Sequence, residues 1–88
     1  MELSRGQIVK SLSGRDKGRY FVVLEIQEGF IWLADGKLRK LEHPKRKKPK
    51  HVQKTNTFVS LDPNLTDKQL RKLLHGYNYP EQPAAPRR

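Results

Sequence analysis

The segment RYFVVLEIQ, residues 19–27, alternates in polarity in a way that constrains the fold of this chain more than any other feature. Successive side chains of a β-strand point to opposite faces, so one face of a strand here would carry Tyr20, Val22, Leu24 and Ile26. The other face begins and ends with charged residues and is apolar in the middle, at Phe21 and Val23. We therefore predict a strand that is covered on one face and half covered on the other.

Turn residues separate this segment from further short apolar runs. Glu28-Gly29 and Asp35-Gly36 are typical of tight turns, because glycine adopts the positive φ that such turns require. With these turns as boundaries, the expected strands are residues 7–12, 19–27, 30–34, 38–41, 51–55 and 58–61. Several short strands in a chain of 88 residues indicate a mainly β fold. A small SH3-like barrel is the first expectation and an OB-fold the second, since closing a sheet removes its exposed edges.

One short helix is predicted after the strands. Thr66 is a good N-cap residue, Gln69 completes a capping box, and Gly76 would end the helix. The apolar stripe of this helix consists of Leu70, Leu73 and Leu74. We expect the stripe to dock on the half-covered sheet face around Phe21 and Val23.

The chain would then divide into three parts. Residues 1–61 would form the barrel with a basic loop at 42–50, and residues 62–76 would form the helix packed on it. Residues 77–88 are rich in proline and poor in apolar residues, which predicts a disordered tail. The first residues contain no apolar stretch of signal-peptide length, and no apolar run is long enough to span a bilayer. We therefore expect a cytoplasmic protein with no membrane association.

The net charge of +10 is concentrated in the middle of the chain. Residues 37–54 carry nine Lys and Arg against Glu42 alone, whereas residues 1–36 are neutral overall. Pro44 and Pro49 bracket the densest part of this run, and proline lacks the N–H that a helix or a central strand needs. We expect an irregular, proline-stiffened loop. Charge of this density destabilises a compact state by self-repulsion, so it predicts a polyanionic partner.

A second basic loop, SGRDKGR at residues 13–19, joins the first two strands. It lacks the Gly-Lys-Ser/Thr ending of a P-loop and precedes a strand, so it is not a nucleotide-binding loop of that kind. Its basic residues could add phosphate contacts beside the central run. Three glycines are expected in structural turns: Gly14, Gly18 and Gly36.

No catalytic residue, cofactor or metal site is predicted. The chain has no cysteine, and it shows no carboxylate pair and no nucleophile and base at useful spacing. His43 and His51 flank the basic run, but Glu42 is the only carboxylate near them, so contact with RNA is a better expectation than a metal.

Two groups of aromatic residues leave alternatives open. Phe30 and Trp32 would share one strand face, and such a pair is more often part of a core than an RNA-stacking surface. Tyr77 and Tyr79 follow the predicted helix and could either pack back on the barrel or meet a base.

The run GQIVKSLSGRDKGRYFVVLEI, residues 6–26, resembles a KOW motif, and Gly18 matches the characteristic glycine of that motif. The longer run through Ala34-Asp35-Gly36 to HPKRKKPKHVQ is similar to the 14e-type large-subunit ribosomal proteins. It is also similar to the 6e- and 27e-like and the short bacterial or archaeal KOW proteins. The resemblance covers residues 6–54. It implies an SH3-like barrel and RNA binding, most often to ribosomal RNA.

These observations predict a non-enzymatic RNA-binding protein of the translation apparatus, monomeric when free and ribosome-associated in the cytoplasm. It would contact ribosomal RNA of the large subunit and neighbouring ribosomal proteins. One alternative is a transient ribosome-associated regulator or assembly factor, and another is an SH3-like protein-interaction module. The predicted RNA-binding residues are Arg15, Lys17, Arg19, Lys37, Arg39, Lys40, His43, Lys45, Arg46, Lys47, Lys48, Lys50, His51 and Lys54.

Overall fold

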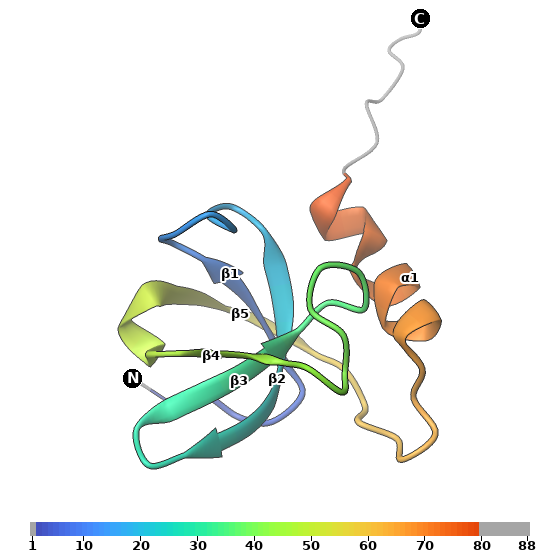
Figure 1. Cartoon of the computed structure of the whole chain (residues 1–88), viewed down its shortest axis with the longest axis horizontal. Coiled ribbons are helices and arrows are strands. Elements are labelled where there is room, and N and C mark those ends of the chain that lie inside the picture. Colours follow the sequence, from blue (N-terminus) through green and yellow to red (C-terminus); the bar gives the residue numbers. More distant parts are fainter. Residues whose placement is uncertain (1, 80–88) are drawn as a thin grey trace, which may run out of the picture.

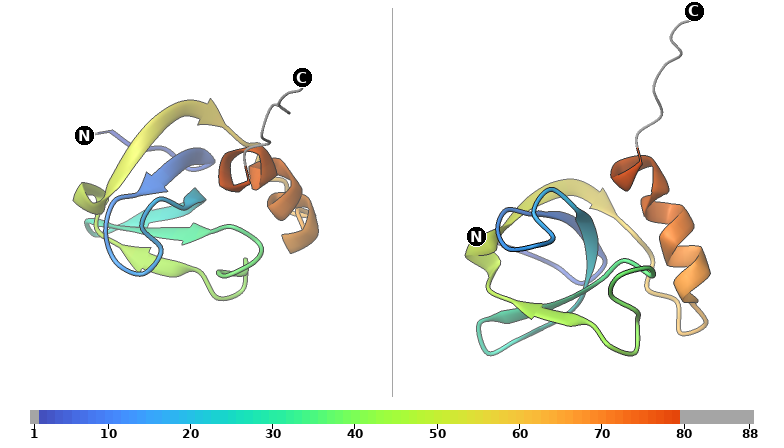
Figure 2. Two further views of the ribbon diagram at one scale, coloured as in Figure 1. Left: turned by 90° about the horizontal axis from the view of Figure 1, so that it is seen from above. Right: turned by 45° about the horizontal axis from the view of Figure 1, so that its top comes forward.

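The computed structural model describes residues 2–79 of the chain. They contain the elements β1 (Gln7–Ser11), β2 (Tyr20–Gln27), β3 (Phe30–Ala34), β4 (Lys45–Lys47), the 3-10 turn η1 (Pro49–His51), β5 (Val52–Phe58) and α1 (Asp67–Asn78). The strands form one antiparallel sheet in the order β4-β3-β2-β1-β5. Figure 1 and Figure 2 show this sheet curved round into a small barrel-like body with α1 at one side. The predicted mainly β, SH3-like barrel followed by one short helix is confirmed.

The sheet curves where its register shifts. One shift lies between Gln7 and Val9 in the β1–β5 pair, and another lies between Val23 and Glu25 in the β2–β3 pair. An extra residue in one strand bends that strand and increases its twist. The inner face of the sheet therefore closes on itself around a buried cluster of Val9, Phe21, Val23, Ile31, Leu33 and Val52.

The helix packs on the outer face of the sheet, so the predicted docking around Phe21 and Val23 is wrong. Leu70 and Leu74 are fully buried, whereas the side chain of Leu73 is 49% exposed. The two buried leucines form a second core cluster with Ile8, Val22 and Ala34. The physical reason is that the curled sheet itself covers the Phe21 face, which leaves the opposite face for the helix.

The ends of α1 differ in how well the sequence predicted them. The capping box is confirmed: the Gln69 backbone N–H donates to Thr66 Oγ1 at 3.1 Å, and the Thr66 N–H donates to Gln69 Oε1 at 3.0 Å. Gly76 does not end the helix, which continues to Asn78. The Asn78 side chain accepts from the Tyr20 N–H at 2.8 Å and donates to the Tyr20 carbonyl at 3.3 Å. This pairing with the start of β2 stabilises the two additional helical residues.

The predicted tail therefore begins too early. Tyr77 belongs to α1, and its ring lies 5.0 Å from that of Tyr20, between ring centroids. Tyr79 caps the C-terminus of the helix, where its N–H donates to the His75 carbonyl. The remainder of the predicted tail, residues 80–88, lies outside the described residues.

From the end of β3 through β5 the structure differs from the predicted elements in three places. No strand forms at residues 38–41, because the buried Asp35 carboxylate accepts the backbone N–H groups of Lys37 and Arg39 and closes a compact turn. Part of the predicted basic loop is the strand β4, which pairs with β3 at the edge of the sheet. An edge strand fits here because Pro44 and Pro49 lie just outside it. In place of the two short strands predicted at 51–55 and 58–61 there is one strand, β5, which ends at Phe58.

Candidate nucleic-acid interface

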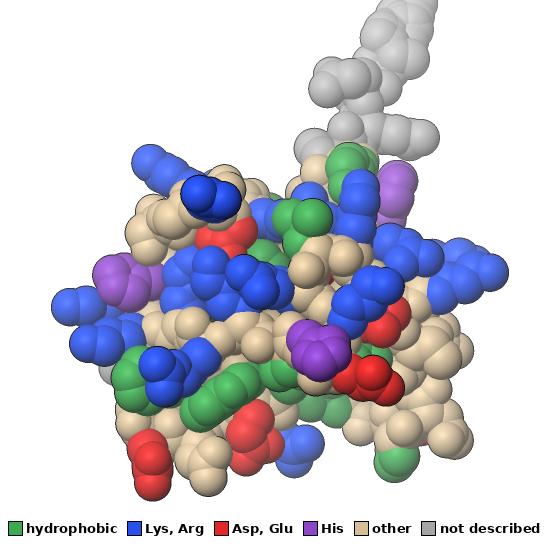
Figure 3. All heavy atoms as spheres, viewed as in Figure 1, with side chains coloured by type: hydrophobic (Ala, Val, Ile, Leu, Met, Phe, Trp, Pro, Cys, Tyr) green, Lys and Arg blue, Asp and Glu red, His purple; other side chains and the backbone are tan. Residues whose placement is uncertain are grey.

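Lysine and arginine side chains gather on one face of the molecule. Figure 3 shows many of them over the β1–β2 loop, β4 and the side of α1, with a few acidic side chains among them and others below, at the β2–β3 turn. Most of the predicted RNA-binding residues are exposed: Arg15, Lys17, Lys37, Arg39, Lys40, His43, Arg46, Lys48, Lys50 and Lys54. The partly buried ones are Arg19, Lys45 and His51, and the buried one is Lys47.

Lys47 is a structural residue, and its predicted role in RNA contact is withdrawn. Its side chain is only 7% exposed. The ammonium group donates to Ser11 Oγ at 2.8 Å, to the Ser13 carbonyl at 2.9 Å and to Asp16 Oδ1 at 2.9 Å. Because these acceptors use its donors inside the fold, Lys47 ties β4 to the β1–β2 loop and has no exposed charge to offer a phosphate.

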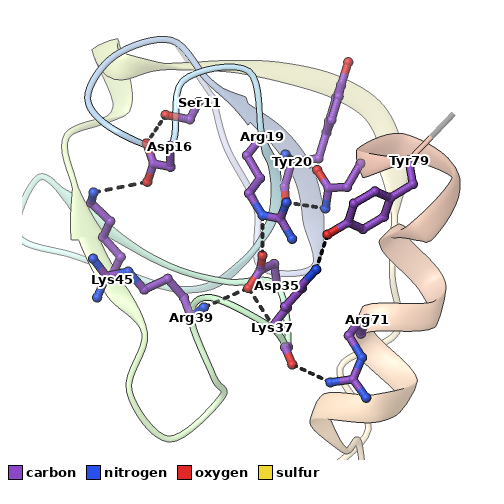
Figure 4. Close-up of polar contacts among 12 residues, drawn as sticks. Ser11, Asp16, Arg19, Tyr20, Asp35, Lys37, Arg39, Lys45, Arg71 and Tyr79 are labelled. Atoms are coloured by element: carbon purple, nitrogen blue, oxygen red, sulfur yellow. Dashed lines mark hydrogen bonds and ion pairs between the residues drawn. The ribbon is translucent and has the colours of Figure 1, made fainter.

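Asp16 lies at the centre of this connection. Besides Lys47, it accepts from Ser11 Oγ at 2.7 Å, and Lys45 Nζ lies 3.1 Å from its second oxygen (Figure 4). Burial raises the pKa of Asp16, but the hydrogen bonds from Ser11, Lys47 and Lys45 outweigh it and lower the pKa from 3.8 to about 2. This role of Asp16 was not predicted from the sequence. The run KRKK, residues 45–48, gave no signal for it, because only the formation of β4 directs Lys45 and Lys47 to one side of the strand.

We expect acid to weaken the fold through Asp16. A carboxyl whose pKa is depressed on folding contributes stability above its unfolded pKa, near 3.8, and loses that contribution as pH falls through its folded pKa, near 2. The contribution at neutral pH is about 2 kcal/mol. Denaturant unfolding of the wild type and of Asp16→Asn should differ most above pH about 5, and the difference should shrink as pH approaches about 2. A difference that stays constant over this range would contradict the prediction.

A second acidic residue organises the other side of the basic face. Asp35 is buried and accepts from Arg19 Nε at 2.7 Å. The guanidinium of Arg19 and the ammonium of Lys37 also lie over the ring of Tyr79, 5.6 and 4.8 Å from its centroid. The hydrogen bond that Lys37 donates to the phenol, together with the nearby Arg19, lowers the pKa of Tyr79. Figure 4 shows this chain of contacts from β2 through the β3–β4 turn to the end of α1.

The two basic segments share a cleft. Its walls come from the β1–β2 loop and β2 on one side and from the β3–β4 connection and β4 on the other: Arg15, Asp16, Phe21, Leu38, Arg39 and Lys45. A neighbouring hollow shares Arg15, Asp16 and Leu38 with it. This hollow extends past Lys17 and Arg19 to Asn78 at the end of α1. The glycine loop and the central basic run therefore lie on one face, a point that the sequence left open. We call these two adjoining hollows the basic cleft.

The other predicted residues lie outside the basic cleft. Those that do not line it are Lys37, Lys40, His43, Arg46, Lys47, Lys48, Lys50, His51 and Lys54. Lys37 lines a separate hollow against α1, together with Arg71, Lys72, His75 and Tyr79. The cations added by α1 were not predicted, because sequence alone does not show that the helix lies beside the β3–β4 turn.

The three predicted turn glycines all have a positive φ: Gly14 at 85°, Gly18 at 89° and Gly36 at 81°. At Gly18 the backbone angle alone requires glycine, since no atom lies within 4 Å of an added Cβ. Gly36 has a second reason, because a Cβ there would lie 2.2 Å from the Asp67 carbonyl oxygen. The turn that carries Lys37 and Arg39 thus touches the first turn of α1.

Comparisons with known proteins do not assign the chain to a family: no protein-family model matches it, and no curated protein matches its sequence. Within residues 2–79, no helix has the length and apolar character needed to cross a membrane. The same part of the chain holds no cluster of three His, Cys, Asp or Glu side chains placed to bind a metal ion.

Proposed function

We propose that this chain is a non-enzymatic RNA-binding protein of the translation apparatus, which binds ribosomal RNA of the large subunit through the basic cleft and the cations around it. The observation that carries the proposal is the meeting of two basic segments, distant in sequence, on the walls of one cleft. Arg15 comes from one segment and Arg39 from the other, and both are exposed. Cations on both sides of a groove suit a phosphodiester backbone.

The cleft is supported by hydrogen bonds that hold it in place without RNA. Lys47 and Asp16 link β4 to the β1–β2 loop, while Asp35 closes the β3–β4 turn and binds Arg19. Such preorganisation reduces the conformational entropy lost when RNA binds. The exposed cations therefore need little rearrangement to contact phosphates.

The choice of ribosomal RNA rests on the resemblance of residues 6–54 to KOW and 14e-type ribosomal proteins. Its characteristic glycine, Gly18, lies in the β1–β2 loop with the positive φ that such a loop requires. Backbone contacts from Lys and Arg position a protein on RNA without reading its bases, so base specificity is not part of this proposal.

Salt dependence tests the proposal. The protein should bind large-subunit ribosomal RNA with an affinity that falls as salt rises, with a log-log slope of roughly −4 to −5 if about six phosphates are contacted. Absence of salt-sensitive binding, together with migration free of ribosomal particles on a low-salt gradient, would refute the proposal. A stoichiometric presence in purified subunits would indicate a permanent component, and a substoichiometric one a transient factor.

A charge-matched pair of variants tests the site itself. Replacing Arg15, Lys17 and Arg39 by Ala should weaken binding roughly tenfold or more near 0.1 M salt and make the slope less negative by about 2 to 3. The control replaces Lys50, Lys54 and Lys68, which are exposed and do not line the basic cleft, and it should lose much less affinity. Equal losses in the two variants would show that net charge, and not the cleft, governs binding.

A further inference from the structure

The outer face of β3 is only partly covered. Ile31 and Leu33 point into the barrel, so Phe30, Trp32 and Ala34 point outward on the alternate face. The helix buries Ala34 but leaves Phe30 and Trp32 partly exposed. Such a pair is more often part of a core, but neither residue belongs to the two buried clusters, because alternation defines the two faces of a strand but not how far a helix extends over one of them.

An arginine joins the two aromatic rings on this face. Arg46 of β4 is the cross-strand partner of Trp32, and its guanidinium lies 4.5 Å from the centroid of the Phe30 ring. Arg46 is exposed, whereas its neighbours Lys45 and Lys47 turn toward Asp16. Figure 3 shows hydrophobic side chains over β3 directly beside Lys and Arg side chains over β4. Three planar groups thus lie together on the outer face of the β3–β4 pair.

We propose that Phe30, Trp32 and Arg46 form a stacking surface for an unpaired base of the bound RNA; this rests on the proposed function. Aromatic rings and arginine guanidinium planes are the groups on which proteins stack unpaired bases. Phosphate contacts alone would not discriminate single-stranded from duplex RNA, whereas this surface accepts a base only where the base is unstacked. The protein should therefore prefer loops, bulges or single strands.

The charges around the surface favour RNA over a peptide. Lys48, exposed at the end of β4, lies next in sequence to the strand that carries Arg46 and supplies a cation for the phosphate beside the stacked base. Glu25 is the cross-strand partner of Trp32 on the other side, and Arg5 Nε lies 3.5 Å from its carboxylate. The Glu25 carboxylate is thus paired with a cation, while Arg46 and Lys48 give the β4 side excess positive charge.

The fluorescence of Trp32 reports on binding at this surface, because Trp32 is the only tryptophan in the sequence. We expect a short single-stranded oligoribonucleotide to quench its fluorescence, and inorganic polyphosphate at equal phosphate concentration to bind with little quenching. An oligoribonucleotide that saturates the protein by anisotropy and leaves Trp32 fluorescence unchanged would overturn the proposal. So would quenching by a proline-rich peptide but not by RNA, which would assign the surface to a protein partner.

Conservative variants separate stacking from charge. Arg46→Lys keeps the charge and loses the planar group, and Phe30→Leu removes a ring. Each should weaken binding to single-stranded RNA by at least about fivefold and leave the affinity for duplex RNA almost unchanged. Phe58→Leu is the matched control, because Phe58 is 57% exposed on β5, away from Arg46, and it should have little effect.

The outcomes distinguish this inference from the proposed function. If the wild-type protein shows no salt-sensitive RNA binding, both the proposed function and the stacking surface are refuted. Salt-sensitive binding that Arg46→Lys and Phe30→Leu do not alter leaves the proposed function in place and overturns the stacking surface alone. Circular dichroism of each variant checks that it is folded.

Discussion

Replacing Leu74 by Asp is expected to destabilise the domain by at least about 3 kcal/mol, a large share of the total stability of a domain of this size. Leu74 is fully buried between α1 and the sheet, where it packs in the cluster of Ile8, Val22 and Ala34. The substitution removes this apolar contact and places a carboxylate where no cation is part of the cluster. Denaturant unfolding followed by circular dichroism measures the loss.

Leu73→Asp is the matched control for this prediction. It makes the same change one residue away, but the Leu73 side chain is 49% exposed. We expect a loss below about 1 kcal/mol, mostly from the lower helix propensity of Asp. Similar losses in the two variants would mean that the helix does not dock through Leu70 and Leu74. A stable Leu73→Asp protein is compatible with docking, because Leu73, although predicted to lie in the contact, is largely exposed.

Replacing Gly36 by Ala is expected to destabilise the domain by about 2–4 kcal/mol. Two costs combine. The first is the φ of 81°, which is unfavourable for alanine. The second is that the new Cβ would lie 2.2 Å from the Asp67 carbonyl oxygen and 2.9 Å from the Arg71 backbone nitrogen. The β3–β4 turn and the start of α1 would have to separate, which also breaks the hydrogen bond that Arg71 donates to the Gly36 carbonyl at 2.9 Å.

Gly29→Ala isolates the backbone cost. Gly29 has the same φ of 81°, but nothing lies within 4 Å of an added Cβ. Its loss should be about 1–2 kcal/mol, from the backbone angle alone. Thermal unfolding of the two variants side by side gives the difference, which measures the contact between the turn and α1. If Gly36→Ala loses no more stability than Gly29→Ala, the contact between the turn and α1 does not require glycine at position 36.

The local elements were predictable because their signals are local. The alternation of residues 20–27 and the apolar run 30–34 each gave a strand close to its observed bounds. Thr66 and Gln69 marked the start of α1, since a capping box involves only residues within one turn. Where a local signal competed with a distant contact, the prediction failed. Gly76 is typical of a helix end, yet the bonds between Asn78 and the Tyr20 backbone extend the helix past it.

The candidate site was predictable as a segment but not residue by residue. Charge counting placed the excess of Lys and Arg in residues 37–54. It treated the charges as equivalent, because a loop gives no reason to separate them. The strand β4 separates them: Lys47 turns inward to Asp16, while Arg46 turns outward to Phe30. Pairing with β3 determines the directions of these side chains, and no pattern in the basic run itself indicates a strand.

By itself the sequence determined the class of fold, the N-terminus of the helix, the turn glycines and the concentration of positive charge, all of which depend on neighbours in the chain. Only the tertiary structure decided which face of the sheet the helix covers, which lysine is structural, and that Arg15 and Arg39 line one cleft. The physical reason is that curvature and packing bring distant residues together. Period and composition define the faces and charges of a segment, but the partner of each face exists only once the sheet has closed.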